Sequence, residues 1–160
     1  VKNVIKRNNQ LAKWRIKMAL DKEPIKLSYA LRMAKKHYPN DKYDHAMRVM
    51  QYVADNEMIP YEYKEECLAL AVMHDLWEDT DYPRGCGIGE KKKKALNLLT
   101  KPKDMDYIEY IKKIRDTACT NWRMCAWWVK LADMKDHLAQ TETLTEKLRD
   151  KYLAALPYLL

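Results

Sequence analysis

One stretch of the sequence places a histidine and three carboxylates directly after an apolar run. His74 and Asp75 follow the apolar residues 69–73. Glu78 and Asp79 come about one helical turn later. A carboxylate beside apolar residues needs compensation for its lost hydration, and a bound cation commonly provides it. The same side chains could instead form the polar end of a helix that faces water, so the pattern indicates a candidate site that other residues must complete.

A second histidine and a distant aspartate complete the pattern. His45 lies upstream, and Asp133 ends the stretch Val-Lys-Leu-Ala-Asp at residues 129–133. The order His…His-Asp…Asp, on three separate helical segments, resembles the HD superfamily of metal-dependent phosphohydrolases. His-Asp-x-x-Glu-Asp-Thr at residues 74–80 narrows the resemblance to the hydrolase domain of RelA/SpoT-type alarmone hydrolases, which act on the 3′-pyrophosphate of (p)ppGpp. The similarity covers about residues 27–138.

This resemblance implies one divalent metal ion held by four protein ligands, namely His45, His74, Asp75 and Asp133. Two imidazoles and two carboxylates suit Mn²⁺, and they would also accept Fe²⁺, Co²⁺ or Zn²⁺. No cysteine belongs to the set, so a closed structural zinc site is not expected. Taken singly, His45 could make only a local hydrogen bond, and Asp133 could be an ordinary helix carboxylate.

The resemblance also implies catalytic and substrate-binding roles. Glu78 and Asp79 would activate or position the attacking water. The alternative is an acidic pair that faces solvent at a helix C-terminus, which is less favourable because negative charge there opposes the helix dipole. The residues expected to contact the substrate are Lys42, Arg48, Tyr107, Lys130 and His137. Arg48 and Lys130 could equally be ion-pair partners of the acidic groups, and Tyr107 could be a core residue.

The residues that bind the nucleoside in alarmone hydrolases are matched less well than the metal ligands. Alarmone hydrolases place an asparagine that helps to hold the nucleoside at the position where this chain has His137. The sequence therefore predicts a metal-dependent hydrolase of a small anionic nucleotide, with (p)ppGpp as the first expectation. One alternative is an HD-type nucleotidase or phosphatase for another nucleotide, including NADPH. The other alternative is a non-catalytic module that binds a nucleotide or RNA.

Composition bounds the class of protein. The 160 residues are 48% hydrophobic, which is typical of a globular chain, and we expect one domain over residues 1–160. No apolar run is long enough for a membrane span, and no signal-peptide pattern opens the chain, so we expect a stand-alone cytoplasmic protein. The net charge is +7, but the basic residues are scattered along the sequence, so a nucleic-acid partner is not favoured. The sequence does not indicate an oligomeric state.

The elements that must position these side chains are predicted to be helices. All three glycines lie within residues 85–89, and no strand pattern of convincing length occurs. We therefore expect an all-α, HD-type bundle of about six to eight helices. The expected helices cover residues 27–37, a segment capped by Asp44, and residues 61–79, 91–99, 104–118, 121–138 and 144–156.

Two expectations concern the ends of the chain. Residues 1–20 could form a basic amphipathic helix that packs on the domain, or one that binds a membrane or nucleic acid. Residues 141–160 are expected to hold a C-terminal helix that Thr143 and Glu146 start as a capping box.

Overall fold

The computed structural model describes residues 25–84, 88–117 and 123–160, together with Lys13. Its helices are α2 (Leu27–His37), α3 (Asn40–Ala54), α4 (Tyr61–Met73), α5 (Leu76–Asp79), α6 (Glu90–Leu99), α7 (Tyr107–Thr117), α8 (Arg123–Ala139) and α9 (Glu146–Leu159). These ranges contain no strand, which confirms the predicted all-α bundle of six to eight helices. The predicted basic helix over residues 1–20 falls outside the described residues, apart from Lys13.

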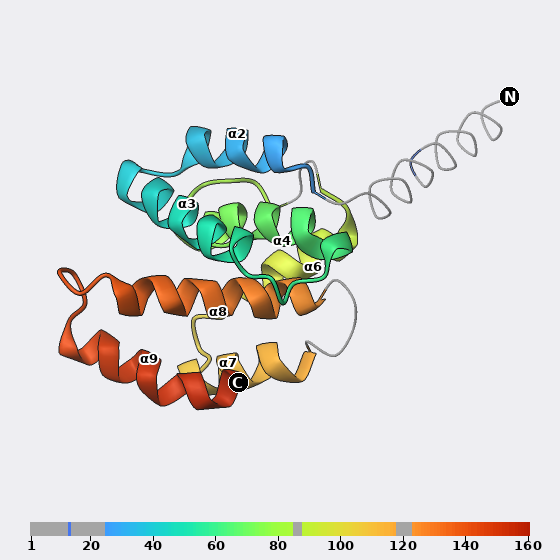
Figure 1. The fold of residues 1–160 in the computed structure, drawn as a ribbon. Helices are drawn as coiled ribbons and strands as arrows, with labels where there is room; N and C mark the ends of the chain where they lie inside the picture. Colours follow the sequence, from blue (N-terminus) through green and yellow to red (C-terminus); the bar gives the residue numbers. More distant parts are fainter. Residues whose placement is uncertain (1–12, 14–24, 85–87, 118–122) are drawn as a thin grey trace, which may run out of the picture.

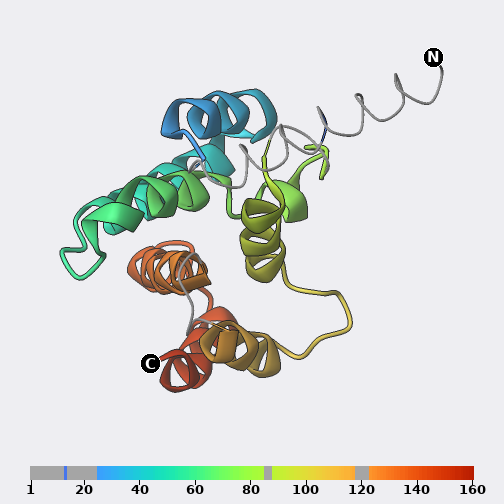
Figure 2. The ribbon, with the colours of Figure 1, turned by 90° about the vertical axis from the view of Figure 1, so that its right-hand side faces the viewer.

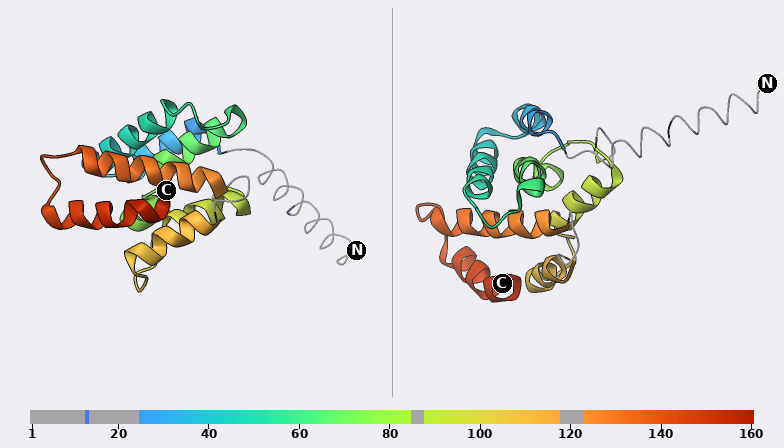
Figure 3. Two further views of the ribbon diagram at one scale, coloured as in Figure 1. Left: turned by 60° about the horizontal axis from the view of Figure 1, so that its bottom comes forward. Right: turned by 45° about the vertical axis from the view of Figure 1, so that its right-hand side comes forward.

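Helix α8 runs through the middle of the bundle (Figure 1). Helices α3 and α4 contact one side of it, with α2 packed on α4 behind them. Helices α7 and α9 lie on the other side, and a view along α8 shows it between the two groups (Figure 2). Helix α9 returns antiparallel to α8 after a short connection (Figure 3). Among the described residues, no helix is both long enough and apolar enough to cross a membrane.

Helix α4 forms the centre of the core. Its residues 69–73 are all fully buried, because α2, α3, α6 and α8 surround them. Residues 69–73 are apolar around the whole circumference of the helix, so this part of α4 is stable only when other helices cover every face. The polar residues that follow α4 are therefore delivered into the interior, beside α3 and α8.

The prediction of one continuous helix over residues 61–79 is wrong, because the helix is interrupted by a turn at His74 and Asp75, between α4 and α5. The carbonyl of Ala71 would accept the Asp75 N–H in a regular helix, but it lies 2.7 Å from His74 Nδ1 instead. The Asp75 N–H donates to the hydroxyl of Tyr38, 3.1 Å away. The His74 side chain therefore replaces a helical hydrogen bond and ends α4.

Two predicted helix caps are also wrong. Helix α3 begins at Asn40, directly after Pro39, so Asp44 lies in its second turn and caps nothing. Helix α9 is capped by Thr145, whose Oγ1 accepts the N–H of Leu148 at 3.3 Å. Thr143 instead donates its hydroxyl to the carbonyl of Gln140, in the turn before the helix.

Candidate metal centre

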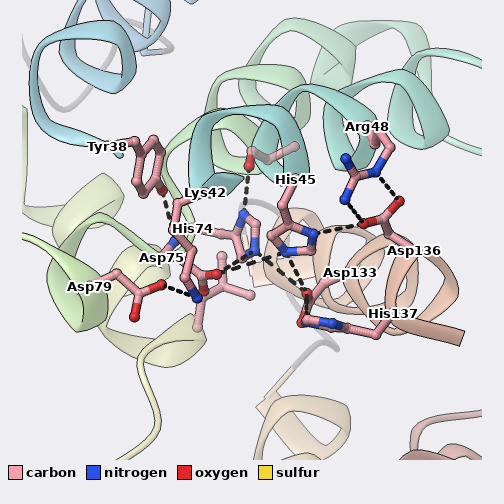
Figure 4. A network of polar contacts seen from close by, with 12 residues as sticks. Tyr38, Lys42, His45, Arg48, His74, Asp75, Asp79, Asp133, Asp136 and His137 are labelled. Carbon is pink, nitrogen blue, oxygen red and sulfur yellow. Dashed lines mark hydrogen bonds and ion pairs between the residues drawn. The ribbon is translucent and has the colours of Figure 1, made fainter. Parts of the chain in front are cut away.

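Three side chains from different elements converge at the contact between α3, α4 and α8. His45 lies on α3, His74 follows α4, and Asp133 lies on α8; all three are buried (Figure 4). Their ligand atoms lie within 4.8 Å of one another. Asp133 Oδ1 is 3.2 Å from His45 Nε2 and 3.6 Å from His74 Nε2. In the described ranges, no other group of histidine, cysteine or acidic side chains is assembled in this way.

Each of the three side chains uses its other polar atom to bind the surrounding protein. His45 Nδ1 is 2.7 Å from a carboxylate oxygen of Asp136. His74 Nδ1 faces the carbonyl of Ala71, and Asp133 Oδ2 accepts a hydrogen bond from Lys130 Nζ at 2.7 Å. These contacts hold the rings and the carboxylate in place, so that the opposite atoms face one another.

The three atoms that face one another fit a bound metal ion. His45 Nε2, His74 Nε2 and Asp133 Oδ1 are buried and have no hydrogen-bond partner. A buried polar atom without a hydrogen-bond partner lowers the stability of the folded state, so three such atoms facing one another are rare in natural proteins. Ligand atoms about 2.1 Å from a metal ion stand about 3.0 to 3.4 Å apart in octahedral or tetrahedral geometry. The observed separations of 3.2 and 3.6 Å are close to that spacing.

The fourth predicted ligand, Asp75, lies at the more open edge of the cluster. Its Oδ2 is 3.3 Å from His74 Nε2 and 3.8 Å from His45 Nε2. The side chain is 20% exposed, against 4% for Asp133. The structure thus brings all four predicted ligands together, with Asp75 outside the closest group of three.

The cluster is electrostatically suited to a cation. Burial alone would lower the pKa of the His74 imidazole, but Asp75 and Asp133 outweigh burial and raise that pKa well above its usual range. Burial would likewise raise the pKa of Asp133, yet Lys130 and the neighbouring imidazoles hold it well below its usual range. The raised pKa of His74 shows that Asp75 and Asp133 stabilise positive charge between them, and the lowered pKa of Asp133 keeps that carboxylate ionised.

Glu78 and Asp79 follow Asp75 on α5, and their backbone N–H groups donate to its carbonyl at 3.1 and 2.9 Å. Glu78 Oε1 accepts a hydrogen bond from the backbone N–H of Lys101. Loss of hydration raises the pKa of the Glu78 carboxyl, more than that hydrogen bond lowers it. Asp79 forms an ion pair with Lys42, whose Nζ is 2.9 Å from Asp79 Oδ2. This pair links α3 to α5.

Besides Lys42, two further residues predicted to bind substrate are engaged as ion-pair partners. The guanidinium of Arg48 donates from both Nε and Nη2 to Asp136, at 2.9 and 3.1 Å. Lys130, which is 11% exposed, donates to Asp133 as described above. The structure therefore favours the ion-pair interpretation that the sequence left open for each of them.

Lys130 is expected to contribute strongly to the stability of the metal-free protein. In Lys130→Met, the buried carboxylate of Asp133 loses its cation, which typically costs about 3 kcal/mol in the free energy of unfolding. Urea unfolding in the presence of a chelator measures this change. Lys112→Met is the matched control, because Lys112 pairs with exposed Glu109 and its removal should change stability little. Equal unfolding midpoints for the two variants would contradict the expectation.

The remaining predicted contacts, Tyr107 and His137, meet side chains of α9. The His137 ring stacks on Tyr152, with centroids 4.9 Å apart and an interplanar angle of 11°, and its Nε2 is 3.1 Å from Asp133 Oδ1. Lys151 Nζ lies 4.3 Å from the centre of the Tyr107 ring. Burial lowers the pKa of Lys151, and the nearby Lys130 lowers it further.

Sequence reasoning missed Lys151, Tyr152 and Asp136. Lys151 and Tyr152 belong to no motif, and only the antiparallel return of α9 brings them near the cluster. Asp136 carried a usable signal, because it lies one turn after Asp133 on the same face of α8.

One hollow reaches the cluster at His45, and a second lies beside the acidic pair Glu78 and Asp79. One of about 440 Å³ lies between α3, α8 and the start of α9, and its lining includes Lys42, His45 and His137. The other, of about 580 Å³, includes Glu78, Asp79 and Lys101 in its lining. Lysine side chains line part of each hollow, so each could attract an anionic ligand.

No protein-family model and no curated protein matches this chain. We therefore infer its function from the side chains of the site. The decisive feature is the set of three buried, unpartnered ligand atoms on α3, α4 and α8.

Proposed function

We propose that this protein is a metal-dependent phosphohydrolase that acts on the 3′-pyrophosphate of a (p)ppGpp-type nucleotide. The observation that carries the proposal is the convergence of His45 Nε2, His74 Nε2 and Asp133 Oδ1, all buried and unpartnered. The order of these residues in the chain, with Asp75 and the acidic pair after His74, is similar to the pattern of alarmone hydrolases. The sequence expectation of a cytoplasmic protein is part of the same proposal.

His45, His74, Asp75 and Asp133 would hold one divalent ion, and Mn²⁺ suits this mixture of nitrogen and oxygen donors. Such an ion, when bound, stabilises negative charge on a phosphate oxygen and lowers the pKa of water. The protein must in addition supply a group that accepts the proton of the attacking water.

Glu78 is the better placed of the two acidic residues for that proton. Its Oε1 is occupied by the Lys101 N–H, which orients the carboxylate and leaves Oε2 to act. The raised pKa of its carboxyl makes it a stronger base than an ordinary glutamate. Asp79 instead holds Lys42 at 2.9 Å, which positions an ammonium group at the edge of the site.

Positive charge near the cluster supports an anionic substrate. The Lys151 ammonium lies over the rings of Tyr107 and Tyr152 and forms no ion pair within the described residues. An ammonium group of this kind can bind phosphate oxygens as a point charge. Lys42 supplies a second cation on the side of α3.

A second candidate is an HD-type nucleotidase or phosphatase acting on another nucleotide, such as NADPH. It is favoured by His137, which stands where alarmone hydrolases use an asparagine and which stacks on Tyr152. An imidazole in that position offers a different shape and different hydrogen bonds to a nucleoside.

A substrate screen separates the two candidates. The purified protein, supplemented with Mn²⁺, is incubated with guanosine 3′,5′-bis-diphosphate, NADPH and a panel of nucleotides, and the products are resolved by chromatography. Release of pyrophosphate from the bis-diphosphate supports the first proposal. Release of phosphate from NADPH or another nucleotide supports the second. Absence of any turnover by metal-loaded protein would contradict both and favour a binding module.

His137→Asn is expected to change the ranking of substrates without changing metal content. His137 lies beside the cluster but outside the closest group of three ligands, so the metal should remain bound. The substitution removes the ring stacked on Tyr152 and installs the asparagine of the alarmone enzymes, so kcat/KM should rise for the bis-diphosphate relative to the other nucleotides. Kinetics across the panel, with His37→Asn as control, measure this. Unchanged kcat/KM ratios would place His137 outside the substrate pocket.

A further inference from the structure

Asp136 is a fully buried carboxylate to which the proposed function assigns no role. It is 0% exposed and lies on α8, one turn after Asp133. It accepts hydrogen bonds from Nε and Nη2 of Arg48, and its Oδ2 lies 2.7 Å from Nδ1 of His45 (Figure 4). Burying a carboxylate costs several kcal/mol of hydration free energy unless charged or hydrogen-bonding partners compensate for it, so its contacts with Arg48 and His45 are significant.

The contact with Asp136 determines which nitrogen of His45 carries a proton. A carboxylate held by a guanidinium can only accept hydrogen bonds, so His45 Nδ1 must be the donor. In the neutral ring the proton on Nδ1 leaves the lone pair on Nε2. Nε2 is the atom that faces His74 and Asp133 without a partner. The hydrogen bond therefore turns the ligand atom of His45 toward the metal centre.

Helices α3 and α8 are paired through this arrangement. On α3, Arg48 lies one turn after His45, and on α8, Asp136 lies one turn after Asp133. His45 contacts both aspartates, one through each ring nitrogen, at 3.2 and 2.7 Å. Arg48 then holds Asp136 from the side away from the cluster, so the carboxylate cannot turn from the ring.

We propose that Asp136, fixed by Arg48, is a positioning residue that sets the tautomer and orientation of His45 for metal binding. This inference rests on the proposed function, because it concerns the same metal centre. His74 obtains the equivalent support from a backbone carbonyl, whereas His45 depends on a charged side chain, which makes its imidazole the stronger donor to a metal.

The test is the affinity for Zn²⁺, measured by calorimetric titration against a competing chelator. Asp136→Asn keeps the size of the side chain and removes its charge, and should weaken zinc binding by about 10- to 100-fold. Asp150→Asn, which removes an exposed carboxylate from α9, should leave the affinity unchanged. Arg48→Lys, which keeps a cation beside Asp136 and leaves the His45 contact intact, should weaken binding less than Asp136→Asn. Circular dichroism of each metal-free variant checks the fold.

A spectroscopic measurement on the unmutated protein gives an independent test. In the Zn²⁺-loaded protein, nitrogen-15 NMR of His45 should show a proton on Nδ1 and zinc on Nε2. Zinc bound through Nδ1, or an unprotonated Nδ1, would overturn the proposal, as would equal zinc affinity for the unmutated protein and Asp136→Asn. Failure of the unmutated protein to bind zinc would instead overturn the metal centre itself. Zinc binding with the expected Asp136 effect but no hydrolysis would overturn the proposed function alone.

Discussion

His74→Ala is expected to abolish both metal binding and hydrolysis. His74 Nε2 is one of the three buried atoms that face one another, and alanine offers no replacement ligand. Loss of an outer-shell partner typically costs 10- to 100-fold in metal affinity, so loss of a direct ligand should cost more than about 100-fold. Metal content after dialysis and turnover with Mn²⁺ measure the two effects.

His37→Ala is the matched control for this experiment. His37 is a histidine at the C-terminal end of α2 that pairs with Asp81 and is not part of the cluster. This variant should keep its metal and its activity. Full metal occupancy in His74→Ala, with a folded chain, would show that the cluster is not a metal site.

The double variant Glu78→Gln with Asp79→Asn is expected to separate binding from chemistry. Neither carboxylate contacts the three ligand atoms, so the metal should stay bound. Loss of the group that accepts the proton of water should lower kcat by about 10²-fold or more. Turnover under saturating substrate, together with metal content, measures both consequences.

The single variants assign the effect to one of the two residues. Glu78→Gln should account for most of the loss in kcat, because Glu78 has the raised pKa and the oriented carboxylate. Asp79→Asn should act mainly on KM, since it releases Lys42 from its ion pair. Glu109→Gln, on the exposed face of α7, is the control. Near-normal turnover in the double variant would return the pair to a structural role.

The two experiments differ in what they test. The His74→Ala experiment tests whether a metal centre exists. The experiment on Glu78 and Asp79 tests whether these residues activate water beside it. If His74→Ala loses its metal while the double variant keeps near-normal turnover, the metal centre stands and another group must accept the proton of the attacking water.

The helical class and the residues of the candidate centre could be predicted from the amino-acid sequence alone. Scarce glycine and the absence of alternating apolar patterns indicated an all-α chain, which the described residues confirm. The order of His45, His74, Asp75 and Asp133 predicted a shared site, and their side chains do lie together. Residue types and order are local properties of the chain, so they can be recognised without coordinates.

The partner of each polar group could be seen only in the folded protein. The sequence predicted one helix over residues 61–79, but the His74 side chain takes over a backbone carbonyl and the Tyr38 hydroxyl accepts the freed N–H. Arg48 pairs with Asp136 because α3 packs against α8, whereas Lys130 pairs with Asp133 one turn away within α8. The hydrogen bonds of Tyr38 and Arg48 join residues far apart in the chain. Local sequence patterns do not specify such partners, whereas packing of α4 between its neighbours does.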